Sequence, residues 1–337
     1  MIAIALISGG LDSILAARLI SGLGIEIIPV NFKIPFCHRA KDNNSASKEA
    51  GLIKENLKQE LVSIDISEDF LKLLENPRYG FGSNMNPCID CKILMFSKAK
   101  ELMQQFGAQF IVTGEVLGQR PMSQHRQALD LIAKKSGLEG LVLRPLSAKN
   151  LDETIPEKEG WVEREKLLNF GGRGRTPQIE LAGKLGIKDF AWPAGGCLLT
   201  DPEFSRRLKD LIEHKELSIN NVKLLKLGRH FRLAPDVKLV VGRDEKENSE
   251  LEKLAQEGDF LFYPNEQLAG PTSLGRGKFN DELFSLASQI TCHYCDLNKA
   301  QNADIIYRQV PATDTHSLNV TPINKTKLAD YHTSPTR

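Results

Sequence analysis

The stretch Ser8-Gly9-Gly10-Leu11-Asp12-Ser13 stands between an apolar run, residues 2–7, and a segment with helical spacing of apolar residues, residues 12–23. A glycine-rich turn between a buried strand and a helix leaves successive backbone N–H groups aimed at one spot, where the helix dipole adds positive potential. Such a spot binds phosphate. Ser8 and Ser13 can donate hydroxyls to phosphate oxygens, and the Asp12 carboxylate can hold Mg²⁺.

An ordinary helix cap is the alternative interpretation of this stretch, because Ser and Asp commonly precede helices. Neither GxxxxGK[ST] nor GxGxxG is present, so the two most familiar phosphate-binding loops are excluded. All six residues occur together at the first strand-to-helix junction of the chain. This combination favours the phosphate-binding interpretation.

The chain around the loop alternates strand-like and helix-like patterns. Strands are predicted at residues 2–7, 26–32, 61–66 and 110–113, and helices at residues 12–23, 46–57 and 92–106. This alternation predicts an α/β fold with a doubly wound parallel sheet, in which ligands bind at the carboxyl edge of the strands. Residues 136–200 are less regular, with helices expected near 162–168 and 177–185. We assign residues 1–200 to this first domain.

A second, smaller α+β domain is predicted for residues 201–295. Its expected elements are helices at 203–213 and 281–288 and strands near 222–227, 238–242 and 260–263. The remaining residues, 296–337, are polar and lack a period, which predicts a C-terminal extension that is partly disordered.

Bulk composition limits the function only weakly. The 337 residues include 44 Lys and Arg against 43 Asp and Glu, so overall charge does not indicate a nucleic-acid partner. No run approaches the roughly 20 apolar residues of a membrane span, and the first strand lacks the pattern of a signal peptide. We therefore expect a cytoplasmic protein without a membrane partner, whose six cysteines do not form structural disulfides.

Two cysteines, Cys88 and Cys91, form a CxxC pair at the start of a predicted helix. The helix dipole there is expected to lower the thiol pKa and favour the thiolate, which binds soft metals. Two thiolates do not complete such a site, so a third ligand is needed. Cys197 follows Pro193-Ala194-Gly195-Gly196 and is the candidate. The alternative is a buried cysteine that packs as a small hydrophobe.

A polar loop, residues 113–119, follows the fourth predicted strand and is placed to line the nucleotide site. An ordinary turn is the alternative. Leu143-Arg144-Pro145-Leu146 follows later in the chain. With the SGGLDS loop and the CxxC pair, these motifs resemble the PP-loop ATP pyrophosphatase domain of the tRNA 4-thiouridine synthetase and tRNA 2-thiouridylase group, over residues 1–200.

This resemblance implies an ATP-dependent tRNA thiouridine synthase, a sulfurtransferase that adenylates a uridine carbonyl oxygen and replaces it with sulfur. Implied cofactors are ATP, Mg²⁺ at Asp12 and a [4Fe-4S] cluster. The implied ATP-binding residues are Ser8, Gly9, Gly10, Leu11, Asp12, Ser13, Phe32, Gly114, Glu115 and Gln119. The implied catalytic residues are Asp12, Cys88, Cys91 and Cys197. The thiols of the three cysteines are the implied cluster ligands.

The resemblance leaves several points open. One branch of the group uses a persulfide and a disulfide in place of a cluster, although the CxxC pair favours the cluster branch. The THUMP RNA-binding domain of the synthetases does not precede the loop in this sequence. Expected partners are tRNA and a sulfur donor, either a cysteine desulfurase or inorganic sulfide, and a homodimer is left open. The alternative function is a PP-loop enzyme that adenylates a small molecule for sulfur or nitrogen transfer.

The second domain contains five arginines that could grip phosphates, against the alternative of a solvated sheet face. They are Arg206, Arg207, Arg229, Arg232 and Arg243. The stretches around Arg229 and Arg243 resemble the RNA-binding domain of NFACT proteins, which implies an RNA-binding module. Cys292 and Cys295 form a second CxxC pair, for which redox, ligand and incidental roles stay open. Cys37 is left unassigned.

Overall fold

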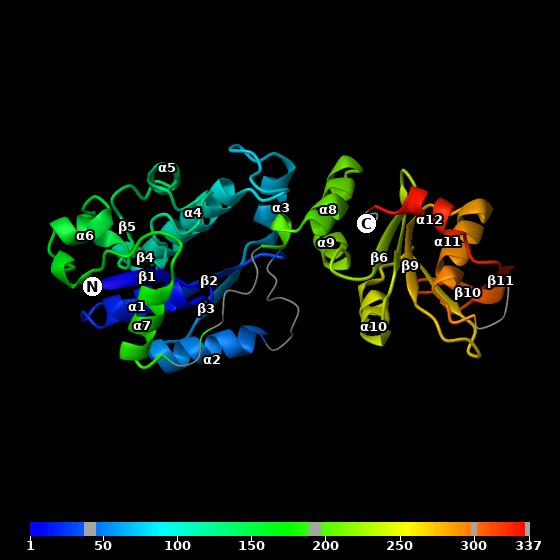
Figure 1. Cartoon of the computed structure of the whole chain (residues 1–337), viewed down its shortest axis with the longest axis horizontal. Coiled ribbons are helices and arrows are strands. Elements are labelled where there is room, and N and C mark those ends of the chain that lie inside the picture. The colour runs from blue at the N-terminus through cyan, green and yellow to red at the C-terminus, as the bar shows by residue number, and fades with distance from the viewer. Residues whose placement is uncertain (37–44, 188–189, 191–196, 298–301, 334–337) are drawn as a thin grey trace. The chain divides into compact units, whose positions relative to one another are not determined.

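The computed structural model describes residues 1–36, 45–187, 190, 197–297 and 302–333 of the chain, without the side chains of residues 45–49. Contacts divide the chain into two compact units, Met1–Thr200 and Asp201–Arg337. Each unit has its own sheet and its own core (Figure 1). We describe them separately.

The N-terminal unit is built on a five-stranded parallel sheet with strand order β3-β2-β1-β4-β5. Its strands are β1 (Ile2–Leu6), β2 (Glu26–Lys33), β3 (Val62–Asp65), β4 (Phe110–Thr113) and β5 (Val142–Leu143). The first four coincide closely with the predicted strands. The predicted α/β fold class with a parallel sheet is confirmed.

Helices cover both faces of this sheet, as strand alternation requires. Ala3 and Ala5 of β1 pack in one hydrophobic cluster with α1. Ile4, which points to the opposite face of the sheet, is also fully buried but does not belong to that cluster. In Figure 1, α2 and α7 lie on one side of the sheet and α4 and α5 on the other. The helices are α1 (Leu11–Ser21), α2 (Ser45–Leu57), α3 (Ser67–Glu75), α4 (Cys88–Phe106), α5 (Arg126–Lys135), α6 (Ile155–Lys158) and α7 (Thr176–Lys184).

The strand order places a topological switch point between β1 and β4. From β1 the chain moves outward through β2 to β3, and it returns to add β4 and β5 on the other side of β1. The loops after β1 and β4 therefore lead away in different directions and leave room for a ligand at the carboxyl edge. Residues 8–10 and 114–119 lie in these two loops, and residues 11–13 form the first turn of α1.

One predicted helix of this unit is wrong. Residues 162–168 contain only a short 3-10 turn, η3 (Arg164–Lys166). The Leu168 and Phe170 N–H groups donate to the carbonyl oxygens of Pro145 and Leu146, at 2.9 and 2.8 Å. These long-range backbone bonds hold the chain extended, which the local apolar spacing did not reveal. The other short turns are η2 (Ala148–Asn150) and η4 (Leu198–Thr200).

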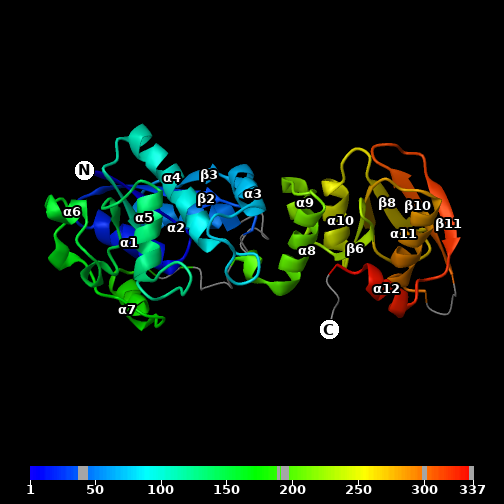
Figure 2. The same cartoon turned by 90° about the horizontal axis from the view of Figure 1, so that it is seen from above.

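The C-terminal unit has an antiparallel six-stranded sheet with strand order β11-β10-β8-β9-β7-β6 (Figure 2). Its strands are β6 (Arg229–Ala234), β7 (Val237–Val241), β8 (Phe260–Pro264), β9 (Ser273–Gly277), β10 (Ala303–Gln309) and β11 (His316–Val320). Its helices are α8 (Pro202–Glu213), α9 (Ile219–Leu224), α10 (Glu245–Leu254), α11 (Asp281–His293) and α12 (Lys325–Tyr331). The smaller α+β domain is thereby confirmed.

Two expectations for this unit are wrong. Residues 222–227 were expected in a strand, but the Ser218 hydroxyl caps α9 by accepting the Asn221 N–H at 3.2 Å. Residues 296–337 were expected to form a loose extension, whereas β10, β11 and α12 complete the sheet and its core. Ile305 of β10, which pairs with both β8 and β11, is fully buried, and Leu328 of α12 is nearly so, because both belong to the core cluster of this unit. Across the described ranges, no helix combines the length and apolar character needed to cross a membrane.

Candidate functional site

The SGGLDS loop turns sharply between β1 and α1. Gly9 has a φ of +67°, which favours glycine, and Gly10 is the N-cap of α1 without a side-chain capping bond. The Ser13 hydroxyl donates to the Gly10 carbonyl oxygen at 2.8 Å and accepts the Ser8 N–H at 3.2 Å. A Ser or Asp side chain therefore does not cap this helix start, which leaves its dipole open to an anion.

The loop after β4 contacts the start of α1 directly, and Gly114 makes this contact feasible. A Cβ atom at Gly114 would lie 2.4 Å from both the Asp12 carbonyl carbon and the Ser13 nitrogen. Any other residue would have to push the two loops apart. The structure thus brings the predicted residues of both loops into one site at the switch point.

The Asp12 carboxylate is held by residues from three parts of the unit. Its Oδ2 atom accepts the Gln119 side-chain amide at 2.7 Å and lies 3.5 Å from the Arg175 guanidinium. Gln119 in turn accepts a hydrogen bond from Gln178 at 3.0 Å. The Asp12 Oδ1 atom is buried and has no partner among the described residues. A buried, free carboxylate oxygen fits a hard cation such as Mg²⁺.

Glu115, the second residue of the loop after β4, forms a buried ionic cluster. Its carboxylate lies 3.2 Å from the Lys92 ammonium and 3.1 Å from the Arg144 guanidinium. Burial alone would raise the pKa of Glu115, but these two cations outweigh burial and hold the pKa below its usual value. Since Lys92 follows Cys91, the cluster ties the cysteine helix to the nucleotide loop. Glu115 thus acts as a structural link behind the loop.

The CxxC pair opens α4, as predicted. Cys88 and Cys91 are both partly exposed. Asp90 between them is structural, because its carboxylate accepts the backbone N–H groups of Arg78 and Tyr79 at 3.1 and 2.9 Å. The expectation of a lowered thiol pKa is wrong for Cys88. Burial raises its pKa, and this outweighs the lowering effect of Asn86 and of two nearby cations.

The turn that carries Cys197 is tied to the segment before Cys88, although the two cysteines are 109 positions apart in the sequence. The Leu199 carbonyl oxygen accepts the Met85 N–H at 3.1 Å, and the Thr200 carbonyl oxygen accepts the Asn84 side-chain amide at 2.8 Å. Within the described ranges, no three His, Cys, Asp or Glu side chains form a ready metal-binding group. The three cysteine thiols are suitable ligands for a soft metal cluster, but among the described residues they are not gathered into one ligand group.

Other predicted residues are placed as follows. Phe32 lies near the carboxyl end of β2, where it pairs with Ile64 of β3, and its side chain is buried. Cys37 and the Pro193-Ala194-Gly195-Gly196 stretch lie outside the described residues. Sequence reasoning missed the roles of Lys92, Arg175 and Gln178. Only the position of Lys92 next to the CxxC pair could have indicated its role.

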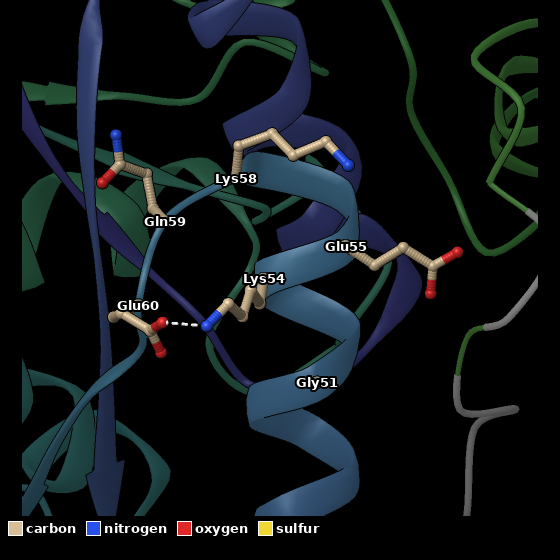
Figure 3. Close-up of a pocket in the computed structure, with 6 residues that line it drawn as sticks. All are labelled: Gly51, Lys54, Glu55, Lys58, Gln59 and Glu60. Carbon is tan, nitrogen blue, oxygen red and sulfur yellow. Dashed lines mark hydrogen bonds and ion pairs between the residues drawn. The ribbon is translucent and has the colours of Figure 1, made fainter.

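A surface depression of about 540 Å³ lies at the end of α2 (Figure 3) and contains none of the predicted site residues. Within it, Lys54 and Glu60 form an ion pair at 2.5 Å, with side chains 68% and 76% exposed. Such a pair contributes little to stability, because water screens it. The buried Glu115 cluster is therefore the energetically important ionic group of the two.

The five arginines of the C-terminal unit do not share one role. Arg232 forms paired bonds with Asp210 and Glu216 at 2.6 to 3.1 Å, so its charge is neutralised inside the unit. Arg229 lies with its guanidinium 4.4 Å from the centre of the Tyr294 ring. Arg243 bonds the Gly228 carbonyl oxygen at 2.7 Å, and its side chain is 45% exposed. Arg232 is therefore not available to bind phosphate, contrary to the expectation for all five arginines.

The SGGLDS loop thus lies at the switch point of the parallel sheet, where open α/β sheets bind ligands. Residues 2–157 match the family described as thiamine biosynthesis protein (ThiI), and residues 228–332 match the NFACT protein RNA binding domain. Both resemblances drawn from the sequence are confirmed. The first match ends before Cys197, so the third cysteine lies outside it.

Curated relatives agree with the first match. The chain is 30% identical over 157 residues to a probable tRNA sulfurtransferase of Thermococcus kodakarensis, covering 45% of this chain and 38% of that protein. It is 32% identical over 242 residues to a probable tRNA sulfurtransferase of Methanosarcina mazei, covering 68% and 51%. The chain thus spans about two fifths to one half of these relatives. A solved 4-thiouridine synthetase–RNA complex with bound ATP is 22% identical, with a TM-score of 0.39, over 55% of this chain and 41% of that one.

Proposed function

We propose that this protein is an ATP-dependent tRNA thiouridine synthase. The observation that carries the proposal is the physical link between two loops and the cysteine helix. Gly114 packs on the backbone of the SGGLDS loop, and its neighbour Glu115 pairs with Lys92 beside Cys91. An activating site and a sulfur-carrying site would thus share one rigid support, as a reaction that joins the two steps requires.

The activating half is the SGGLDS loop. Its backbone N–H groups and the α1 dipole suit the phosphates of ATP, and the Ser8 and Ser13 hydroxyls add donors. Mg²⁺ would be held by the free Oδ1 atom of Asp12, where it would neutralise phosphate charge. Arg175, 3.5 Å from the same carboxylate, supplies a cation next to the loop.

The proposed reaction has two displacement steps, adenylation of the uridine oxygen and its replacement by sulfur. In the first, the uridine carbonyl oxygen attacks the α-phosphorus of ATP, the bond to pyrophosphate breaks, and pyrophosphate leaves. In the second, a sulfide sulfur attacks the activated carbon, a C–S bond forms, the C–O bond breaks, and AMP leaves with the oxygen. The loop donors stabilise the charge that develops at phosphorus in the first step.

The sulfur half comprises Cys88, Cys91 and Cys197, which we propose as ligands of a [4Fe-4S] cluster. Support comes from the backbone bonds that bring the Cys197 turn to residues 84–85. Three thiolates would leave one iron open to bind sulfide. An outside donor, a cysteine desulfurase or inorganic sulfide, would supply the sulfur. The RNA would be held by the NFACT-type unit.

The activating step is tested by AMP formation. Protein purified without oxygen is given ATP, Mg²⁺, sulfide and an unmodified tRNA transcript, and AMP is measured with and without the tRNA. We expect AMP formation that depends on tRNA. Equal AMP formation without tRNA would instead favour transfer to a small molecule, and no AMP at all would contradict the proposal.

A pair of glycine variants makes this assay specific to the loop contact. Gly114→Ala places a Cβ against the Asp12 and Ser13 backbone and should reduce AMP formation at least about tenfold, since small misplacements at a reacting centre are costly. Gly51→Ala is the control, because a Cβ at Gly51 in α2 meets no atom within 4 Å. An equal loss of AMP formation in both variants would contradict a specific role for the contact between Gly114 and the SGGLDS loop.

The cluster is tested separately by colour and iron content. The protein purified without oxygen, or reconstituted with iron and sulfide, should be brown, and Cys88→Ala or Cys197→Ala should be colourless. A wild-type protein that stays colourless after reconstitution would refute the cluster and leave persulfide chemistry on the same cysteines.

A further inference from the structure

The C-terminal unit contains a cavity of about 580 Å³ that the proposed reaction does not use. Five segments line it: the start of β6, the turn after β7, the first residues of α10, the end of β8 with the loop after it, and the residues after α11. They contribute Arg229, Arg243, Asn265, Glu266, Tyr294 and Asp296 to its wall. We call it the platform cavity, because a planar pair of side chains forms one side.

The planar pair is Arg229 and Tyr294. The Arg229 guanidinium lies 4.4 Å from the centre of the Tyr294 ring and is fixed by a hydrogen bond to the Gly242 carbonyl oxygen at 3.1 Å. A guanidinium held over an aromatic ring covers that face of the ring and presents its own outer face, on which a nucleobase can stack. Both side chains are partly exposed, so the surface is open to a ligand.

The second CxxC pair holds Tyr294 in this position. Cys292 is fully buried in the core of the unit, and its thiol donates to the Val320 carbonyl oxygen at 3.6 Å. Cys295 packs against Gly270, where a Cβ would lie 2.6 Å from the sulfur. The two cysteines thus anchor the chain on both sides of Tyr294, and the stacking surface is formed before any ligand arrives.

The polar groups of the cavity favour a base over a phosphate. The Asn265 Oδ1 atom is buried and accepts no hydrogen bond from any described residue. Four carboxylates, of Asp244, Glu245, Glu266 and Asp296, line the cavity beside only two arginines. Their negative charge repels a phosphate, whereas the free Oδ1 acceptor of Asn265 matches the amino groups of adenine, cytosine and guanine. Uracil has no amino group.

We propose that the platform cavity binds one unpaired, amino-bearing nucleobase of an RNA, stacked on the Arg229 guanidinium that Tyr294 supports, with its amino group donating to Asn265. This inference rests on the proposed function only in taking the RNA to be the tRNA substrate. Aromatic and arginine stacking recognises unpaired bases, which can be splayed out of a single strand onto a protein surface.

Binding of short labelled oligonucleotides to the full chain tests the inference. Fluorescence anisotropy gives the affinity for oligoadenylate, oligocytidylate and oligouridylate. Wild type should prefer the first two. Tyr294→Ala should weaken oligoadenylate binding roughly tenfold, as expected for the loss of one stacked base, and Tyr294→Phe should retain it. Asn265→Ala should remove the preference over oligouridylate.

Lys209→Ala is the matched control, since Lys209 is exposed on α8 and does not line the cavity. It should leave the base preference unchanged. Unchanged oligoadenylate binding in Tyr294→Ala, with an unchanged melting temperature, would overturn the inference, as would preferred binding of a basic peptide. Because the assay contains neither ATP nor sulfide, its failure is distinguishable from a failure of tRNA thiolation.

Discussion

The two CxxC pairs share a spacing but lie at opposite ends of a helix. Cys88 is the first residue of α4, whereas Cys292 lies in the last turn of α11 and Cys295 just beyond it. The first pair is partly exposed and linked through Lys92 to the nucleotide loop. In the second, Cys292 is buried, and burial raises the pKa of Cys295 to about 12. Spacing alone therefore does not assign chemistry to a CxxC pair, since the helix end and the surroundings decide it.

The largest difference between the pairs is expected in tRNA thiolation. Cys91→Ser should reduce the rate at least about a hundredfold, because it removes one of the proposed sulfur-carrying thiols. Cys292→Ala should lower the rate far less, since that thiol donates to the Val320 carbonyl oxygen in the core of the C-terminal unit and takes no part in the proposed sulfur transfer. Thiouridine formed per unit time is measured by mass spectrometry of digested transcripts. Equal losses of thiolation rate in the two variants would contradict the different roles that we assign to the two CxxC pairs.

The next effect concerns the ion pairs behind the first CxxC helix. Glu115→Gln should lower the free energy of unfolding of the N-terminal unit by about 3 to 5 kcal/mol, because Lys92 and the buried Arg144 lose their carboxylate. Glu60→Gln removes the exposed ion pair of Figure 3 and should cost at most about 1 kcal/mol. Urea denaturation measures both. Similar costs would show that Glu115 does not tie the helix to the loop.

A smaller difference between the two CxxC pairs is expected in the free energy of unfolding. Cys292→Ala should lower the unfolding free energy of the C-terminal unit by about 1 to 2 kcal/mol, since it leaves a gap in a fully buried site. Cys91→Ser, in metal-free protein, should change stability by less than about 1 kcal/mol at its partly exposed position. A stable Cys292→Ala variant would count against a structural role for the second pair.

The smallest effect is in thiol reactivity. Only the thiolate reacts with iodoacetamide, so a thiol with a pKa of about 12 reacts slowly at pH 8 and faster as pH rises toward 12. Peptide mass spectrometry of metal-free native protein should show Cys295 alkylated at least about tenfold more slowly than the Cys88 and Cys91 peptide. Faster labelling of Cys295 at pH 8 would show that its surroundings are more open than described.

Local patterns predicted the architecture of the N-terminal unit well. The first four strands and the SGGLDS turn follow from apolar runs and from glycines that the backbone needs. Long-range contacts were invisible to the sequence. Gln178 reaches Asp12 through Gln119 across 59 residues, and Leu168 pairs with Pro145, so neither the site network nor the missing helix at 162–168 could be foreseen.

The C-terminal unit was predicted less well for a related reason. Residues 303–331 have few strongly apolar stretches, yet Ile305 and Leu328 are buried because neighbouring strands and helices cover them. Tertiary packing here outweighs local composition. The same holds for Cys88, whose raised pKa reflects burial rather than its place at a helix start.

The central claim is that the SGGLDS loop and the first CxxC pair together thiolate tRNA. It is tested most directly by mass spectrometry of tRNA nucleosides from a strain that lacks this gene and is complemented with wild type, Cys91→Ser or Cys292→Ala. One thiouridine should disappear in the deletion strain and return with wild type and Cys292→Ala, but not with Cys91→Ser. Thiouridines that remain unchanged in the deletion strain would contradict the account.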